Sequence, residues 1–208
     1  VSVPLNSLVV LKDGPIRVIS DLKGKKVGFS VGGFEEALLS GMLQKYNLKL
    51  SDVDLVNINF SLSPSLIAKK VDAVIGAFRN FELNQMDIVN HPGRAFYPEE
   101  HGVPTYEELI YIANQKNKNN PLFDKFFSAI QKATLTIIND PVSTWKDFSS
   151  FRKGLDDELN KRAYKDTISR FALRPQAHDI KTYENFSNFL KRKGIIKKIT
   201  KVETFAKP

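Results

Sequence analysis

The stretch GFSVG at residues 28–32 matches the G-x-S-x-G pattern that surrounds the nucleophile of many serine hydrolases. Ser30 is the candidate nucleophile, and Asp72 and His101 follow it in the order serine, aspartate, histidine. The α/β-hydrolase arrangement requires several strands before the nucleophile and a loop that supplies an oxyanion donor. Only 29 residues precede Ser30 here and none resembles an HGGG motif. The pattern therefore favours a binding turn over a catalytic serine.

The same turn contains Gly32 and Gly33 and runs directly into an apparent helix. Glycines at a helix N-terminus expose backbone N–H groups to a ligand, although many such turns carry glycine only for tight packing. Glu35 and Glu36 already place negative charge in the first helical turn, which disfavours a phosphate at this position. We expect a neutral or weakly cationic polar ligand.

A second group of residues with binding chemistry follows an apolar segment at GAFRNFE, residues 76–82. Phe78 can stack on a planar ring, and Glu82 can accept hydrogen bonds from an exocyclic amine. The alternative places Phe78 in the core and makes Glu82 an acid at a helix N-terminus. The residues by themselves leave both interpretations open.

Metal and nucleic-acid chemistry find little support in the sequence. His91, His101 and His178 are dispersed, and there is no cysteine, so no metal site and no cofactor are predicted. The net charge of +8 arises in residues 150–208, which hold 15 Lys/Arg and 7 Asp/Glu. Those charges alternate with apolar residues at helical spacing, which is typical of a solvated helix face, and no nucleic-acid partner is predicted.

The elements that position these residues are predicted from periodicity and turn residues. Hydrophobic content of 42% and the lack of an 18-residue apolar run are typical of a globular α/β chain. We expect strands in LNSLVVL (5–11), KKVGFS (25–30), LVNINF (55–60) and VDAVIGAF (71–78), and helices at 34–46, from Ser63-Pro64 onward, and at 82–89.

Residues 25–89 thus alternate between strand and helix, which predicts a mainly parallel sheet covered by helices. In such a sheet ligands bind at the carboxyl ends of the strands, where Ser30 and Phe78 are expected. Residues 91–107 are expected to be loop, and ELIYIA (108–113) is a further strand candidate. Helices are then predicted from Asn120-Pro121, from Asp140-Pro141, over 155–171 and over 182–193 before Gly194.

Several segments resemble one known family. In order, DLKGKKVGFSVGGFEEALL, VDAVIGAFRNFELNQM and YPEEHGVPTYEELI are similar to the periplasmic binding proteins for thiamine pyrimidine precursors, whose wider family includes the yeast pyrimidine synthase. The closing segments NPLFDKFFSAIQKAT and TYENFSNFLKRKGIIKKITKVETFA resemble the helices that end these proteins. The resemblance extends over essentially all 208 residues.

The resemblance implies a type II periplasmic-binding-protein fold, with two βα lobes joined by crossover strands. Residues 20–104 correspond to the second lobe, and residues 1–19 and 105–208 to the crossover strands and the mostly helical C-terminal part of the first lobe. LNSLVVL and ELIYIA are the implied crossovers. We expect the N-terminal part of the first lobe, with its aromatic ligand contacts, to lie outside these residues.

The function implied is that of a non-enzymatic solute-binding component of an ABC importer. The implied ligand is hydroxymethylpyrimidine or formylamino-aminomethyl-pyrimidine, and the implied partner is an ABC permease. The protein is expected to be a monomer that is either periplasmic or membrane-anchored and extracytoplasmic. Glu82 matches the acid that pairs with the pyrimidine amino group. The full predicted ligand-binding set is Asn6, Ser30, Gly32, Gly33, Phe34, Glu35, Phe78 and Glu82.

Two alternatives remain within the same fold. A hydroxymethylpyrimidine-phosphate synthase requires iron, pyridoxal phosphate and a cysteine run, where this chain reads GVPTYEELIYIA (102–113). A receptor for another small solute, such as a sulfonate, taurine or nitrate, conflicts with Glu35 and Glu36 beside the glycine turn.

Overall fold

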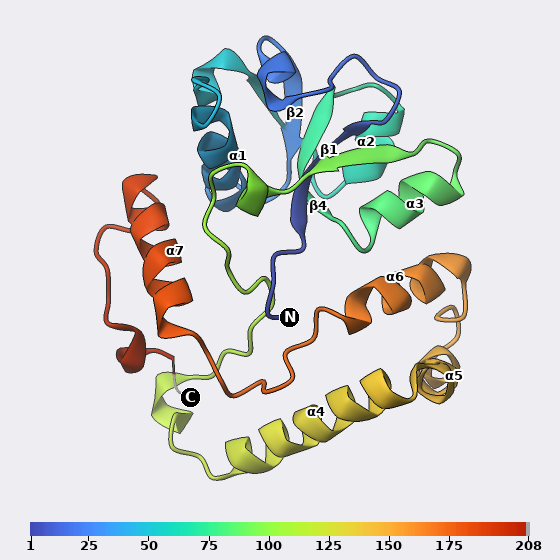
Figure 1. The fold of residues 1–208 in the computed structure, drawn as a ribbon, viewed down its shortest axis with the longest axis vertical. Helices are drawn as coiled ribbons and strands as arrows, with labels where there is room; N and C mark the ends of the chain where they lie inside the picture. Colours follow the sequence, from blue (N-terminus) through green and yellow to red (C-terminus); the bar gives the residue numbers. More distant parts are fainter. Residues whose placement is uncertain (207–208) are drawn as a thin grey trace.

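The computed structural model describes residues 1–206 and has a five-stranded sheet at its centre (Figure 1). The strands are β1 (Asn6–Leu11), β2 (Lys26–Phe29), β3 (Asp54–Asn57), β4 (Ala73–Phe78) and β5 (Gly93–Phe96). Their order across the sheet is β3-β2-β4-β1-β5. Strand β2 is parallel to β3 and β4, whereas β1 runs antiparallel to β4 and β5. The predicted α/β class is confirmed, but the sheet is mixed rather than mainly parallel, because β1 pairs antiparallel with both of its neighbours.

Helices cover both faces of this sheet (Figure 1). Helix α1 (Phe34–Gln44) lies on one face, while α2 (Leu62–Ile67) and α3 (Glu82–Ile88) lie on the other. The alternation of side chains along β1 explains this arrangement, because neighbouring residues of a strand point to opposite faces. Leu8 and Val10 pack with the residues of α1, and Val9 packs with those of α2 and α3.

The C-terminal part of the chain is helical, as predicted. Helices α4 (Leu122–Asn139), α5 (Pro141–Phe151) and α6 (Glu158–Ile168) form an arc beside the sheet, and α7 (Ile180–Arg192) lies next to α1 (Figure 1). Phe189 of α7 joins the core of the α1 face. Short 3₁₀ segments occupy Ile19–Leu22, Leu50–Asp52, Pro98–Glu100, Gln115–Asn117 and Val202–Thr204. Residues 207–208 of the predicted 105–208 segment lie outside the described residues.

Two helix-start predictions met different outcomes. Asp140 caps α5 as expected, because its Oδ1 accepts a hydrogen bond from the Ser143 N–H at 3.0 Å and Pro141 is the first helical residue. Helix α2, by contrast, begins at Leu62 after Ser61, so the prediction of Ser63 as the cap and Pro64 as the first helical residue was two residues late. Pro64 still falls in the first turn, where its missing N–H costs no helical hydrogen bond.

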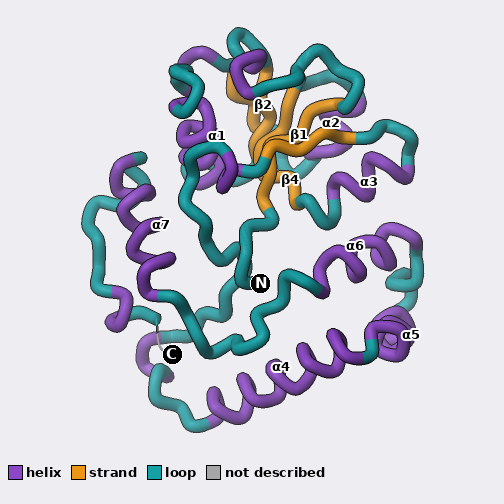
Figure 2. The backbone as a smooth tube through the Cα atoms, in the orientation of Figure 1, coloured by secondary structure: helices purple, strands orange, loops and turns teal. Residues whose placement is uncertain are grey.

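Two strand predictions were wrong. The segment ELIYIA (108–113) contains no strand and belongs to the connection before α4, which Figure 2 draws mostly as loop. It bends at Glu108–Leu109. A strand needs a neighbour for its backbone groups, and among residues 1–206 no other strand lies beside this segment. Conversely, β5 forms within residues 91–107, which were predicted as loop. It is short and pairs along the outer edge of β1.

Gly76 allows a carboxyl group to be buried against the sheet. Its φ of +102° lies in a region that residues with a Cβ avoid, and a Cβ placed there would overlap the carboxyl group of Glu35. The N–H of Gly76 donates to Asn6 Oδ1 at 3.1 Å, beside the irregularity in the β1–β4 register between Ser7 and Leu8.

We therefore expect Gly76→Ala to lower the free energy of unfolding by roughly 2–4 kcal/mol, the combined cost of overpacking and of a forbidden backbone angle. Chemical denaturation measures the effect. Gly154→Ala is the matched control, because Gly154 also has a positive φ of +87° but has no atom within 4 Å of the added Cβ. Its cost should be only about 1 kcal/mol. Equal losses in the two variants would contradict the proposed overlap.

Candidate functional site

The carboxyl ends of β2, β3 and β4 lie at one edge of the sheet, because these three strands are parallel and adjacent. The turns that follow them contain most of the predicted binding residues. Ser30 to Gly33 follow β2, and Phe78 ends β4 four residues before Glu82 opens α3. The topology thus brings the two predicted groups, far apart in sequence, to the same edge.

Glu35 closes the turn that precedes α1. Its side chain reaches back, and Oε2 accepts hydrogen bonds from the backbone N–H groups of Ser30 at 2.7 Å and Val31 at 3.2 Å. Glu36 similarly accepts from the Gly33 N–H at 2.7 Å. Three of the turn's backbone donors are thus already bonded to carboxylates of the protein. The expectation that this turn does not serve a phosphate agrees with this arrangement.

The Glu35 carboxyl group is also deeply buried, with 5% of the residue exposed. Burial raises the pKa of Glu35, while the hydrogen bonds from Ser30 and Val31 act in the opposite direction. The residue was predicted to face a ligand, and the structure places its carboxyl group under the turn. Its contacts make it a support for the backbone of Ser30–Gly33.

The contacts of Ser30 differ from those of a catalytic serine. Its Oγ accepts a hydrogen bond from the Phe60 N–H at 3.1 Å, in the turn after β3. Asp72 accepts from the Lys26 N–H at 2.9 Å, at the opposite ends of β2 and β4 from Ser30. His101 Nδ1 bonds the Tyr46 hydroxyl at 2.8 Å. The three residues of the hydrolase alternative are therefore not brought together.

Glu82 lies at the start of α3, next to the end of β4. Its Oε2 accepts the Phe78 N–H at 2.6 Å, and its own backbone N–H provides a second hydrogen bond. Burial is the largest influence on this group and raises the pKa of Glu82. A carboxyl group offers about four lone-pair positions, so two backbone bonds leave capacity for a ligand. Phe78 is half-buried at the same turn.

Asn6 and Phe34 pack within the protein, whereas Gly32 does not. Asn6 is buried and its side chain accepts from Gly76. Phe34 makes an edge-to-face contact with the Tyr106 ring at a centroid distance of 5.8 Å, and Tyr106 stacks on Phe186 of α7 at 4.5 Å. Gly32 is exposed at the tip of the turn. These contacts position the turn against α7.

Arg79 connects the β4 turn to the beginning of β1. Its side chain, 9% exposed, forms a two-pronged ion pair with Glu99 at 2.6 and 3.0 Å and donates to the Asn6 carbonyl at 2.9 Å. The guanidinium carbon lies 3.9 Å from the centre of the Tyr97 ring. Sequence reasoning did not identify Glu99 as the partner of Arg79, because Glu99 lies twenty positions away in a segment predicted as loop.

Glu108 also stabilises the start of β1, through hydrogen bonds to its backbone. Its Oε2 accepts hydrogen bonds from the backbone N–H groups of Leu5 and Asn6 and from the Tyr106 hydroxyl, all at 2.9 Å. Burial and the neighbouring Glu108 raise the pKa of the Tyr106 hydroxyl, which therefore remains protonated. Sequence reasoning missed this role because Glu108 was assigned to a strand.

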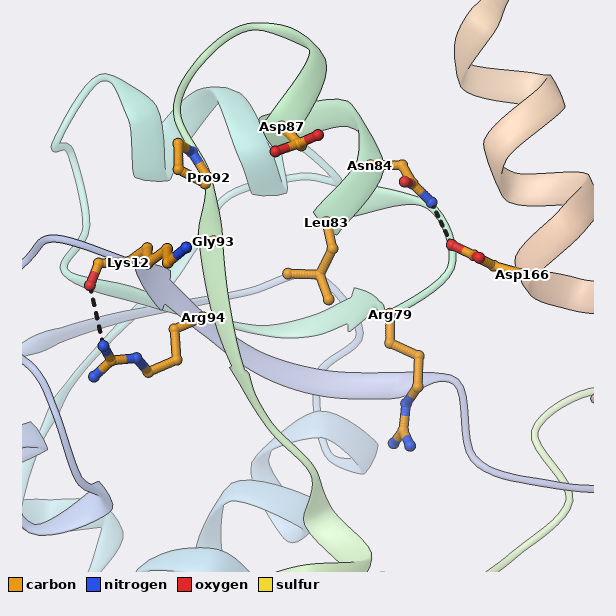
Figure 3. A pocket seen from close by; sticks show the side chains of 9 residues that line it. All are labelled: Lys12, Arg79, Leu83, Asn84, Asp87, Pro92, Gly93, Arg94 and Asp166. Atoms are coloured by element: carbon orange, nitrogen blue, oxygen red, sulfur yellow. Dashed lines mark hydrogen bonds between the residues drawn. The ribbon is translucent and has the colours of Figure 1, made fainter.

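A cavity of about 410 Å³ lies between α3, β5 and α6 and reaches Arg79, the residue that follows β4 (Figure 3). Asn84 and Asp166 are hydrogen-bonded across one side of it at 2.7 Å, which ties α3 to α6. None of the eight predicted ligand-binding residues lines it; its lining residues are Lys12, Arg79, Leu83, Asn84, Asp87, Pro92, Gly93, Arg94 and Asp166. The cavity is open and mixed in charge.

Metal-binding geometry does not occur in the part of the chain that the structure describes. Among residues 1–206 there is no group of three or more His, Asp or Glu side chains that could hold a metal ion. Within the same residues, no helix combines the length and the apolar character needed to cross a bilayer.

The sheet order and the flanking helices form an α/β fold that this chain shares with solved periplasmic binding proteins. The aliphatic sulphonate-binding protein SsuA of Escherichia coli, a periplasmic protein, superposes with a TM-score of 0.71 over 100% of this chain and 68% of its own, at 13% identity. At that identity the likeness concerns the fold alone.

The chain belongs to the NMT1/THI5-like family, whose model matches residues 1–144. A protein of Haemophilus influenzae named for thiamine biosynthesis is 45% identical over 99% of this chain and 66% of its own length. A 4-amino-5-hydroxymethyl-2-methylpyrimidine phosphate synthase of Schizosaccharomyces pombe is 26% identical over 93% of this chain and 58% of its own length. A formylaminopyrimidine-binding protein of Halalkalibacterium halodurans is 27% identical over 66% of this chain and 42% of its own length.

This chain therefore spans at most about two thirds of the length of these curated relatives. The predicted family and fold class are confirmed. The division into lobes and the roles of individual site residues stay predictions.

The raised pKa of Glu35 gives a prediction for stability against pH. A folded-state pKa above the unfolded value means that the folded protein binds more protons, so stability is lost as pH rises through the folded pKa. Glu35→Gln keeps a side-chain oxygen for the Ser30 and Val31 N–H groups and removes the charge. We expect the variant to match the wild type near pH 4 and to exceed it in melting temperature near pH 8.

Thermal unfolding at a series of pH values measures this difference. Glu184→Gln is the control, because Glu184 is exposed and its change should leave the pH profile unaltered. A Glu35→Gln profile parallel to that of the wild type would show that burial of the charge does not limit stability.

Proposed function

We propose that this chain is the ligand-binding part of a solute receptor for a thiamine-precursor aminopyrimidine. The observation that carries the proposal is the partly buried Glu82 carboxyl group, which is bonded to the Phe78 N–H at the carboxyl end of the central strand β4. The names of two relatives, one for thiamine biosynthesis and one for formylaminopyrimidine binding, support the same ligand class.

A protonated carboxyl group is complementary to an aminopyrimidine. It donates its O–H to a ring nitrogen and accepts an N–H from the adjacent amino group, which gives two parallel hydrogen bonds. The raised pKa of Glu82 favours this protonated form. The ring of Phe78 at the same turn supplies a surface on which the pyrimidine can stack.

The glycine turn disfavours an anionic ligand. Glu35 and Glu36 occupy the N–H groups of Ser30, Val31 and Gly33, which an anion would otherwise use. A sulfonate or nitrate would meet two carboxyl groups where it needs donors. This arrangement supports a neutral or weakly cationic ligand, although a protein of similar fold is named for sulphonate binding.

A synthase of the same family is the second candidate, and the relative from Schizosaccharomyces pombe favours it. The yeast-type synthase has a run of cysteines where this chain reads GVPTYEELIYIA, residues 102–113. Iron or pyridoxal phosphate in the purified full-length protein, together with product formation, would support the synthase and replace the receptor proposal.

The proposed mechanism is closure of two lobes around the ligand, with the permease of an ABC importer as the partner and an extracytoplasmic monomer as the working form. The closed state gains the contacts of Glu82 and of the turn at Ser30, and the open state lacks them. Differential contact of this kind is what allows the ligand to shift the population toward the closed form.

Isothermal titration of the full-length protein tests the ligand class. We expect heat with 4-amino-5-hydroxymethyl-2-methylpyrimidine and its formylamino-aminomethyl relative, and none with taurine or nitrate. Binding of taurine or nitrate without any response to an aminopyrimidine would refute the assignment.

The shared proton gives a second test. In the complex, Glu82 and the ring nitrogen share one proton. At a pH above the pKa of the free carboxyl group and that of the free ligand, neither partner carries this proton, so binding takes one up from solution. Affinity should then fall by about tenfold per pH unit as pH rises. In Glu82→Gln, whose side-chain oxygen still accepts the Phe78 N–H, binding should be roughly tenfold weaker at low pH and should no longer decline with rising pH. Titrations in several buffers measure both effects, and Glu184→Gln should keep the wild-type slope.

A further inference from the structure

Phe60 is an exposed aromatic side chain next to the proposed site, and sequence reasoning assigned it to a strand. It is 76% exposed, although β3 ends three residues earlier at Asn57. Its φ is +61°, and that of the preceding Asn59 is +48°. Two consecutive residues other than glycine are thus left-handed, a conformation that is unfavourable for a bulky side chain.

Hydrogen bonds from the surrounding residues hold this turn in place. The Phe60 N–H donates to Ser30 Oγ at 3.1 Å, the Asn59 N–H to Asn57 Oδ1 at 3.0 Å, and the Ser61 N–H to the Ile58 carbonyl at 2.9 Å. The side chain of Ser30 is therefore used to fix the backbone that displays Phe60. An unfavourable conformation that its neighbours enforce, on a ring left in solvent, is typical of a ligand-contacting position.

The sheet order determines what Phe60 can face. Strand β2 lies between β3 and β4, so the turn of Phe60 and the turn of Phe78 flank the Ser30 turn on opposite sides. Two strand spacings separate β3 from β4, which is about 9.6 Å between backbones. A planar ring between two aromatic side chains needs roughly 7 Å between those side chains, so rings that lean inward can contact both faces of one ligand.

We propose that Phe60 is a wall of the ligand site and that it packs against the planar ligand on the flank opposite Phe78. The inference rests on the proposed function, since it assigns a further contact to the same site. A phenyl ring offers no hydrogen bond, so its contribution is selective for flat or methylated aromatic ligands and gives nothing to small polar anions. Glu82 supplies the polar recognition, and Phe60 and Phe78 supply the apolar surfaces.

Isothermal titration with 4-amino-5-hydroxymethyl-2-methylpyrimidine, on the full-length protein, tests the proposal. Phe60→Ala should weaken binding by about 5- to 50-fold, the scale of one lost aromatic stacking contact, and Phe60→Tyr should retain most of the affinity. Phe151→Ala is the matched control, because Phe151 of α5 is 86% exposed and distant in sequence from the strand ends. Its affinity should be that of the wild type.

Phe60→Gly separates binding from folding. Glycine accepts a positive φ, so the variant should melt at or above the wild-type temperature while binding as weakly as Phe60→Ala. Unchanged affinity in Phe60→Ala and Phe60→Gly, in a protein that binds the pyrimidine and loses affinity through Glu82→Gln, would overturn the role of Phe60 and leave the proposed function standing. Equal losses in Phe60→Ala and Phe151→Ala would overturn it as well. A wild-type protein that binds no aminopyrimidine would overturn both proposals.

Discussion

The buried carboxyl group of Glu35 determines the form of the sheet edge at which β2, β3 and β4 end. A carboxyl group away from water requires hydrogen-bond donors, and here the donors are the backbone N–H groups of Ser30 and Val31. It also requires space, which the missing side chain of Gly76 provides on β4. One side chain from α1 thus fixes the turn after β2 and dictates the residue in the neighbouring strand. The geometry of Ser30, and through it of Phe60, depends on this arrangement.

Carboxyl groups serve the same purpose at three other positions around this edge. Glu36 binds the Gly33 N–H, Glu82 binds the Phe78 N–H, and Glu108 binds two N–H groups at the start of β1. Arg79 adds the one cationic connection described here, between Glu99 and the Asn6 carbonyl. Loops at a binding site are commonly mobile, whereas these are held by charge-assisted hydrogen bonds to the backbone. The backbone donors left unbonded are correspondingly few, which is the basis for proposing a ligand that brings its own N–H groups.

The parts of the fold that sequence reasoning predicted are those with local periodicity. The strand and helix alternation over 25–89 and the helices after Asn120 follow from apolar spacing and from Asp-Pro and Asn-Pro starts. ELIYIA was wrongly assigned because strand propensity says nothing about a pairing partner, and β5 was missed because its four residues carry almost no pattern. Phe78 and Glu82 were chosen as site candidates because they follow a buried strand, and the structure places them together at the end of β4. Phe60 was assigned to a strand because it continues an apparent alternation, whereas its backbone is left-handed. The role of Gly76 depends on a contact across 41 positions.

The arrangement of titratable groups favours recognition over catalysis at this edge. General acid–base catalysis needs a group that both gives and takes a proton near a reacting atom, with a partner that orients it. Ser30 Oγ is engaged by a backbone N–H, and Asp72 and His101 are bonded elsewhere. Glu82 can exchange a proton, but its described partners are backbone N–H groups that fix its orientation. Under the proposed function, a fixed acid beside Phe78 would hold one protonation and tautomeric form of a heteroaromatic ligand. Selectivity would then come from the match between that proton and the ligand's ring nitrogen.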